Sequence, residues 1–195
     1  MILKIFKTQF LILSICCLLL AASSVAAARL YLMPLSQTIY QDNSFIVEVK
    51  LDTEGKEINT VEANLTYSSD FLEVIDVSKG NSILTLWLKE PDVQQKDVSL
   101  IGGIPNGFQG EEGLIAKLIF RGKEIGEGIV SFKENSKVLL NDGKGTETRL
   151  NFSEGNYEII KKPDIVVVLP PKILTLKLKV TDLRPSVSSA QIPKL

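Results

Sequence analysis

The chain has 195 residues, 22 basic and 23 acidic side chains and a formal net charge of −1 at pH 7, so nothing indicates a basic surface for nucleic acid or anionic lipid. It has no histidine, and its two cysteines are Cys16 and Cys17. Without histidine, and with no cysteine after residue 17, the chain beyond that residue has neither the Ser-His-Asp or Cys-His groups for catalysis nor the usual ligands of a zinc site. We therefore expect no enzyme, cofactor or metal.

The first 28 residues have the layout of a secretory signal peptide. Lys4 and Lys7 precede an almost wholly apolar run at 10–22, and small residues follow at 24–28. Cleavage after residue 26, 27 or 28 fits this pattern, and an uncleaved anchor helix is the alternative. We expect a secreted or cell-surface protein that meets the membrane only through this segment. Both cysteines lie in this segment, so the exported chain has no disulfide and must rely on its hydrophobic core for stability.

Short stretches of alternating polarity then follow one another as far as residue 160. A period of two places successive side chains on opposite faces of a strand. At 58–67, for example, Val61, Ala63, Leu65 and Tyr67 alternate with polar residues. The sequence predicts nine strands, at 30–35, 44–51, 58–67, 72–77, 82–88, 98–104, 114–120, 128–132 with 137–140, and 150–152 with 157–160.

Turn-forming residues separate these strands, and no window of twelve residues after the signal has a helical period. The fifth strand is expected to end at Glu90-Pro91-Asp92, with Leu84, Leu86 and Leu88 on one face and Trp87 on the other. The sixth strand is expected to lead into a glycine-rich loop at 102–113. Many short strands with turns between them predict an all-β sandwich at 29–162.

A further strand pattern appears at 163–195, after the sandwich should be complete. Four apolar residues from Leu174 to Val180 alternate with threonines and lysines, following a charged hinge that contains Pro163. A lone strand cannot bury its own apolar face. We interpret 163–195 as a linker and the start of a second, incomplete domain. An extra edge strand of the first domain is the alternative.

The frame at 58–77, with Leu65-x-Tyr67 before Leu72-Glu73-Val74, together with the glycine-rich stretch at 102–113, resembles the cohesin domain. The resemblance covers residues 30–160 and implies a nine-stranded jelly-roll sandwich. It also implies a non-catalytic scaffold role, because cohesins hold dockerin modules in extracellular carbohydrate-active assemblies. In that family the partner docks on one sheet. The matching partner-binding positions here are Thr60, Glu62, Trp87, Gly103 and Ile104.

Two of these positions also have simpler interpretations. Trp87, the only tryptophan, is either an exposed anchor for a protein or a sugar ring, or a side chain packed beneath the glycine-rich stretch. Glu62 is either a contact residue or an ordinary solvated position. The alternative function is a carbohydrate-binding module that contacts polysaccharide, which would need several coplanar aromatic side chains. A third possible function is that of a surface domain without a specific ligand.

Two segments match the acceptor pattern for N-glycosylation, Asn64-Leu65-Thr66 and Asn151-Phe152-Ser153. The pattern matters only in a host that forms such linkages. The adjacent acids Glu111 and Glu112 do not resemble a glycosidase pair, because neighbouring residues of a strand point apart.

Overall fold

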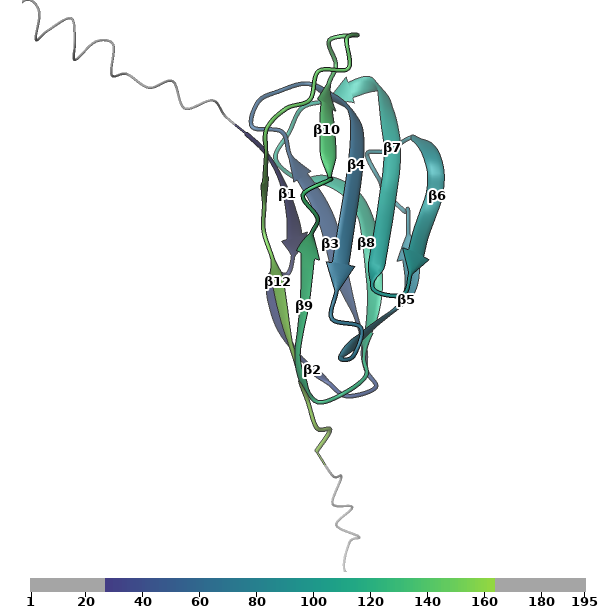
Figure 1. The fold of residues 1–195 in the computed structure, drawn as a ribbon, viewed down its shortest axis with the longest axis vertical. Coiled ribbons are helices and arrows are strands. Elements are labelled where there is room, and N and C mark those ends of the chain that lie inside the picture. Colours follow the sequence, from purple (N-terminus) through teal and green to yellow (C-terminus); the bar gives the residue numbers. More distant parts are fainter. Residues whose placement is uncertain (1–26, 164–195) are drawn as a thin grey trace, which may run out of the picture. The chain divides into compact units, whose positions relative to one another are not determined.

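The computed structural model describes residues 27–163, and all regular structure in this range is β-strand (Figure 1). The predicted signal segment before residue 27 and the predicted strand pattern at 174–180 lie outside the described residues. Within residues 27–163 there is no helix of the length and apolarity needed to cross a membrane. The all-β class predicted from the alternation is confirmed.

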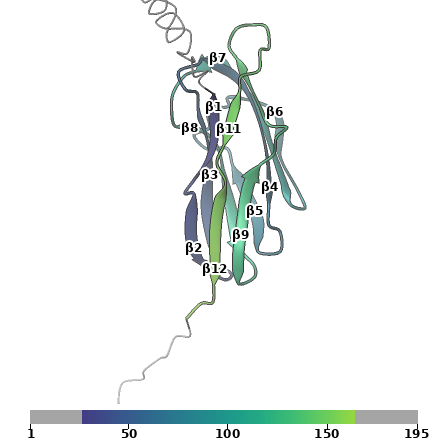
Figure 2. The same ribbon diagram turned by 60° about the vertical axis from the view of Figure 1, so that its left-hand side comes forward.

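Two sheets form a sandwich (Figures 1 and 2). One has the strand order β11-β1-β3-β8-β5, and the other has the order β2-β12-β9-β4-β7-β6, with β10 also paired to β4. The strands are β1 (Ala28–Met33), β2 (Ser36–Tyr40), β3 (Ser44–Asp52), β4 (Ile58–Tyr67), β5 (Leu72–Ser78), β6 (Leu86–Gln94), β7 (Asp97–Phe108), β8 (Gly113–Gly122), β9 (Gly126–Phe132), β10 (Lys137–Leu140), β11 (Leu150–Phe152) and β12 (Gly155–Ile160).

The alternation in the sequence decides which side chains enter the layer between the sheets. In β3, Val47 and Val49 are fully buried, whereas Ile46 and Glu48 lie on the other face. Complete burial of such a side chain contributes about 1.5–3 kcal/mol relative to exposure. Summed over both sheets, this layer is the main source of stability.

Aromatic rings join the two sheets at one part of the core. The ring of Phe45 on β3 lies 5.7 Å from Phe120 on β8 and 5.1 Å from Tyr157 on β12, measured between centroids. The Tyr157 hydroxyl donates a hydrogen bond of 2.8 Å to the carbonyl of Pro34. Burial raises the pKa of Tyr157 far above its ordinary value, so the hydroxyl keeps its proton and remains a donor.

The predicted count of nine strands is wrong, because the described residues form twelve. The predicted first strand ends at Pro34 as expected, because proline has no amide hydrogen to donate to the ladder, but a further strand, β2, follows that was not predicted. β1 stays in the first sheet, in parallel pairing with β11, and β2 joins the second sheet in parallel pairing with β12. The eighth and ninth predicted strands divide, and β9 and β10 pair with different parts of β4. β1 begins at Ala28, one residue before the predicted domain start.

The predicted fifth strand is displaced along the chain. β6 begins at Leu86 and continues through Pro91 to Gln94, although Pro91 was expected to end it. Two register shifts between Trp87 and Asp92 accommodate the proline, which an edge strand tolerates because one side of its ladder is unpaired. The predicted common face is wrong, because Leu84 is buried whereas Leu86 is exposed.

The glycine-rich stretch is largely strand rather than loop, since β7 continues to Phe108. Gly102 allows this close packing. A Cβ atom at Gly102 would lie 3.0 Å from Cδ1 of Leu84 and 3.0 Å from the carbonyl oxygen of Leu86. The missing side chain therefore lets β7 pass directly beside the start of β6.

Candidate functional site

The outer surface of β10, β4, β7 and β6 is the sheet face on which the resemblance places partner binding. Directly paired residues of antiparallel strands point to the same side, so the register arranges this surface in rows. We name the two rows nearest the start of β6 the four-strand face. One row is Leu139, Thr60, Gly103 and Leu86, and the next is Lys137, Glu62, Ile101 and Lys89.

Two leucines at the edge of the four-strand face are more than half exposed. Leu86 is 53% exposed and Leu88, at the register shift beside Lys89, is 62% exposed. Gly103, the partner of Leu86, presents no side chain, and a Cβ atom there would contact Leu86 at 3.8 Å. The apolar side chain of Leu86 therefore lies over bare backbone, where it is open to contact from outside.

The charged groups of the four-strand face already have partners. Lys137 Nζ lies 3.0 Å from Glu147 Oε1, and this hydrogen bond raises the pKa of Lys137. Lys89 Nζ lies 2.6 Å from Asp92 Oδ2. Because these lysines are neutralised within the domain, the exposed leucines are the groups that gain most from a partner.

Asn64 on β4 holds the Glu62 carboxylate in place. Asn64 Nδ2 donates to Glu62 Oε1 at 3.1 Å, and Ser99 Oγ donates to Asn64 Oδ1 at 2.9 Å. The Ser136 hydroxyl accepts a hydrogen bond from the backbone N–H of Asn64 and donates one to the backbone carbonyl of Asn64, both at 3.1 Å. Only 9% of Asn64 is exposed. Of the two acceptor patterns for glycosylation, only the one at Asn151 has an exposed asparagine in the folded domain.

A polar region lies farther along the same surface, beyond Asn64. Lys133 Nζ is 2.6 Å from Asp97 Oδ2, and this hydrogen bond lowers the pKa of Asp97. A polar hollow of about 200 Å³ lies here, lined by residues that include Asn64, Asp97 and Asn135. This part of the surface is polar, in contrast to the leucine edge.

The structure brings together three of the five predicted contact positions. Thr60, Glu62 and Gly103 are neighbours on the four-strand face. Trp87 is paired with Gly102 and packs against the core, and Lys79 Nζ lies 5.6 Å from its ring centroid. The side chain of Ile104 is only 6% exposed and belongs to the core. Neither residue belongs to the outward rows of the four-strand face.

Sequence reasoning missed several residues of this surface, and most of them lie on β6 and β10. Strict alternation predicted a common face for Leu84, Leu86 and Leu88, but Leu84 precedes β6 and is buried, whereas Leu86 and Leu88 are exposed. A usable signal was Gly103, because an outward glycine next to a leucine exposes that leucine. The missed residues are Leu86, Leu88, Lys89, Ile101, Lys137 and Leu139.

No protein-family model and no curated protein sequence matches the chain. Solved structures of cohesin modules do match it. The cohesin CaCohA2 of Clostridium acetobutylicum, in complex with a variant of CaDoc0917, has a TM-score of 0.58 at 12% identity, covering 68% of this chain and 99% of the other. A non-cellulosomal cohesin of the archaeon Archaeoglobus fulgidus has a TM-score of 0.58 at 19% identity, with 70% and 93% covered.

A type I cohesin–dockerin complex of Clostridium thermocellum, Coh-OlpA with Doc918, has a TM-score of 0.53 at 15% identity, covering 69% of this chain and 100% of the other. Each of these modules is matched over nearly its whole length. At such low identities the likeness concerns the backbone and not the contact residues. The described domain thus has a cohesin-like fold.

Proposed function

We propose that this domain is a non-catalytic binding module of a secreted or cell-surface scaffold, and that it holds a dockerin-type protein module on the four-strand face. The cohesin-like fold supports this, as does the similar Clostridium thermocellum structure, which is a cohesin–dockerin complex. The observation that carries the proposal is the exposed pair Leu86 and Leu88 beside Gly103. Thr60 and Glu62 complete the proposed contact set.

The arrangement favours a protein partner over a polysaccharide. A glycan would stack on exposed aromatic rings, but the outward positions of the four-strand face contain none, and Trp87 packs against the core. The exposed apolar groups of this face are branched aliphatic side chains, which gain free energy when another protein covers them but give a sugar ring no aromatic surface to stack on. We therefore rank polysaccharide binding behind protein binding as the function of this face.

The expected energetics follow from exposure. Full burial of a leucine contributes about 1.5–3 kcal/mol, so covering the half that is still exposed contributes roughly 1 kcal/mol for each of Leu86 and Leu88. The ion pairs of Lys89 and Lys137 are already formed, so rearranging them adds little. The proposed association should therefore depend weakly on salt.

Calorimetric titration with a panel of purified dockerin modules tests the proposal, together with a pull-down on insoluble glucan. The double variant Leu86→Ala/Leu88→Ala should weaken dockerin binding by roughly tenfold or more, given about 1 kcal/mol per leucine. Ile46→Ala is the matched control, because Ile46 is 50% exposed on the opposite sheet. Binding to glucan but to no dockerin module would contradict the proposal.

A further inference from the structure

The strand β2 is an open edge of the larger sheet. It stands at one end of the strand order, and within residues 27–163 β12 is the strand with which it pairs (Figure 2). Its five residues, Ser36–Tyr40, contain no charge and no proline. Its register with β12 has no shift. A regular, uncharged edge presents free amide and carbonyl groups to any extended chain that approaches.

The other sheet edges in the described domain have features that discourage pairing. β6 contains Lys89, Glu90, Pro91 and Asp92 and two register shifts. β5 contains two acids and a register shift, and β11 has only three residues. Charges, proline, bulges and short length are the usual protections of edge strands. β2 contains no charge, no proline and no bulge, so it is the sheet edge most accessible to pairing.

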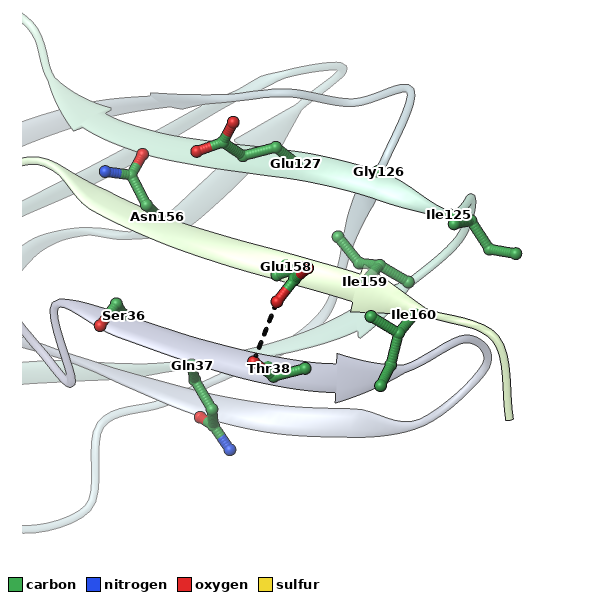
Figure 3. A pocket seen from close by; sticks show the side chains of 10 residues that line it. All are labelled: Ser36, Gln37, Thr38, Ile125, Gly126, Glu127, Asn156, Glu158, Ile159 and Ile160. Carbon is green, nitrogen blue, oxygen red and sulfur yellow. Dashed lines mark hydrogen bonds between the residues drawn. The ribbon is translucent and has the colours of Figure 1, made fainter. Parts of the chain in front are cut away.

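A groove of about 860 Å³ lies over β2, β12 and β9 (Figure 3). Glu127 and Glu158 are paired in register across β9 and β12, although their side chains point apart, and within residues 27–163 neither carboxylate takes part in an ion pair (Figure 3). Thr38 on β2 donates a hydrogen bond of 3.2 Å to Glu158. Like charges placed directly opposite on a sheet destabilise it, so a cation in this groove would be stabilising.

We propose that the edge of β2 accepts an extended segment of a partner protein, and that an arginine or lysine of this segment binds the carboxylate of Glu158, with the charge of Glu127 on the next strand adding to the attraction. This interaction surface is separate from the four-strand face and independent of dockerin binding. Backbone hydrogen bonds to β2 supply the pairing, as in other cases of strand addition. The acidic pair selects a basic partner.

The distances suit a long cationic side chain. An added strand would lie one strand spacing from β2 and about 9.6 Å, two spacings, from β12. The short side chain of Thr38 lies between, so an arginine can pass over it toward Glu158. Arginine fits best, because its planar guanidinium binds carboxylates through paired hydrogen bonds. A metal ion fits less well, since residues 27–163 contain no cluster of three metal-binding side chains.

Fluorescence anisotropy with a labelled peptide, Gly-Thr-Val-Arg-Val-Thr, tests this proposal on the purified protein. The same peptide with citrulline in place of arginine keeps the shape and removes the charge. We expect the arginine peptide to bind at least tenfold more tightly, and we expect it to slow hydrogen exchange at the amides of β2. Equal affinity of the two peptides, or no binding at millimolar concentration, would overturn the proposal.

Protein variants locate the site. Glu127→Gln/Glu158→Gln should reduce the affinity for the arginine peptide at least tenfold without lowering the melting temperature, because it removes a like-charge pair. Glu111→Gln/Glu112→Gln, in the exposed connection between β7 and β8, is the charge-matched control. Thr38→Lys should also abolish binding, since a lysine protects an edge strand. Unchanged affinity in the double variant, or dimerisation through β2 without peptide, would refute the assignment.

Discussion

Replacing Asn64 by alanine should destabilise the domain more than its position on an outward-facing row suggests. The substitution removes one acceptor, for Ser99 Oγ, and the donors to Glu62 Oε1 and to the carbonyl of Asn135. The bond to Asn135 is long, at 3.5 Å, and contributes least. The backbone bonds to Ser136 remain, because they do not involve the side chain.

The magnitude follows from these contacts. Two good hydrogen bonds contribute about 0.5–1.5 kcal/mol each, so Asn64→Ala should lower the free energy of unfolding by roughly 1–3 kcal/mol. The assay is urea denaturation at pH 7 followed by tryptophan fluorescence, with Trp87 as the probe. Asn151→Ala is the matched control, because Asn151 is exposed and its loss should change stability by less than about 0.5 kcal/mol.

A double-mutant cycle with Ser99→Ala separates the hydrogen bond from other effects. If Ser99 and Asn64 interact as the 2.9 Å contact indicates, the coupling energy should be about 0.5–1.5 kcal/mol. A loss below about 0.5 kcal/mol in Asn64→Ala, or full additivity in the cycle, would show that the network does not support this surface. The reasoning about how Glu62 is held would then fail as well.

Three further substitutions test the core, a close approach and the response to pH. Leu118→Ala removes a fully buried side chain and should lower the free energy of unfolding by about 2–5 kcal/mol in urea denaturation. Gly128→Ala would place a Cβ atom 2.6 Å from Cγ of Leu72, so the melting temperature should fall even though the added group is small. Burial alone would raise the pKa of Glu48, but the hydrogen bonds and charges of Lys117 and a second lysine outweigh it and lower that pKa. Glu48 therefore adds stability above its unfolded pKa of about 4.3, and this contribution disappears as the pH falls through the lower folded value. Glu48→Gln should cost about 0.5–1 kcal/mol at pH 7 and almost nothing in strong acid, and an equal loss at both pH values in denaturation curves would contradict this assignment.

Strand positions in the middle of the sheets were predictable from local sequence. The predicted strand at 58–67 has the bounds of β4, and that at 44–51 differs from β3 by one residue. Both strands have neighbours on two sides and one face in the core. Such a strand needs alternating apolar residues to bury that face, so its position can be recognised from the sequence alone.

Edge strands were predicted less well, for a physical reason. β6 has one paired side, so it tolerates Pro91 and register shifts that an inner strand would not. A parity count beyond the start of such a strand is unreliable, and it wrongly placed the buried Leu84 on one face with the exposed Leu86. β2 was missed because only Ile39 among its five residues is buried.

The sequence by itself determined that the chain forms a sandwich of short strands, since a period of two leaves few other ways to bury its apolar residues. It also indicated Thr60 and Glu62 as outward neighbours on one strand. Only the tertiary structure decided that β10 and β6 flank that strand and its partner, and that Leu86 rather than Trp87 faces outward there. Pairing between distant strands is set by the packing of the whole core, which no local pattern encodes.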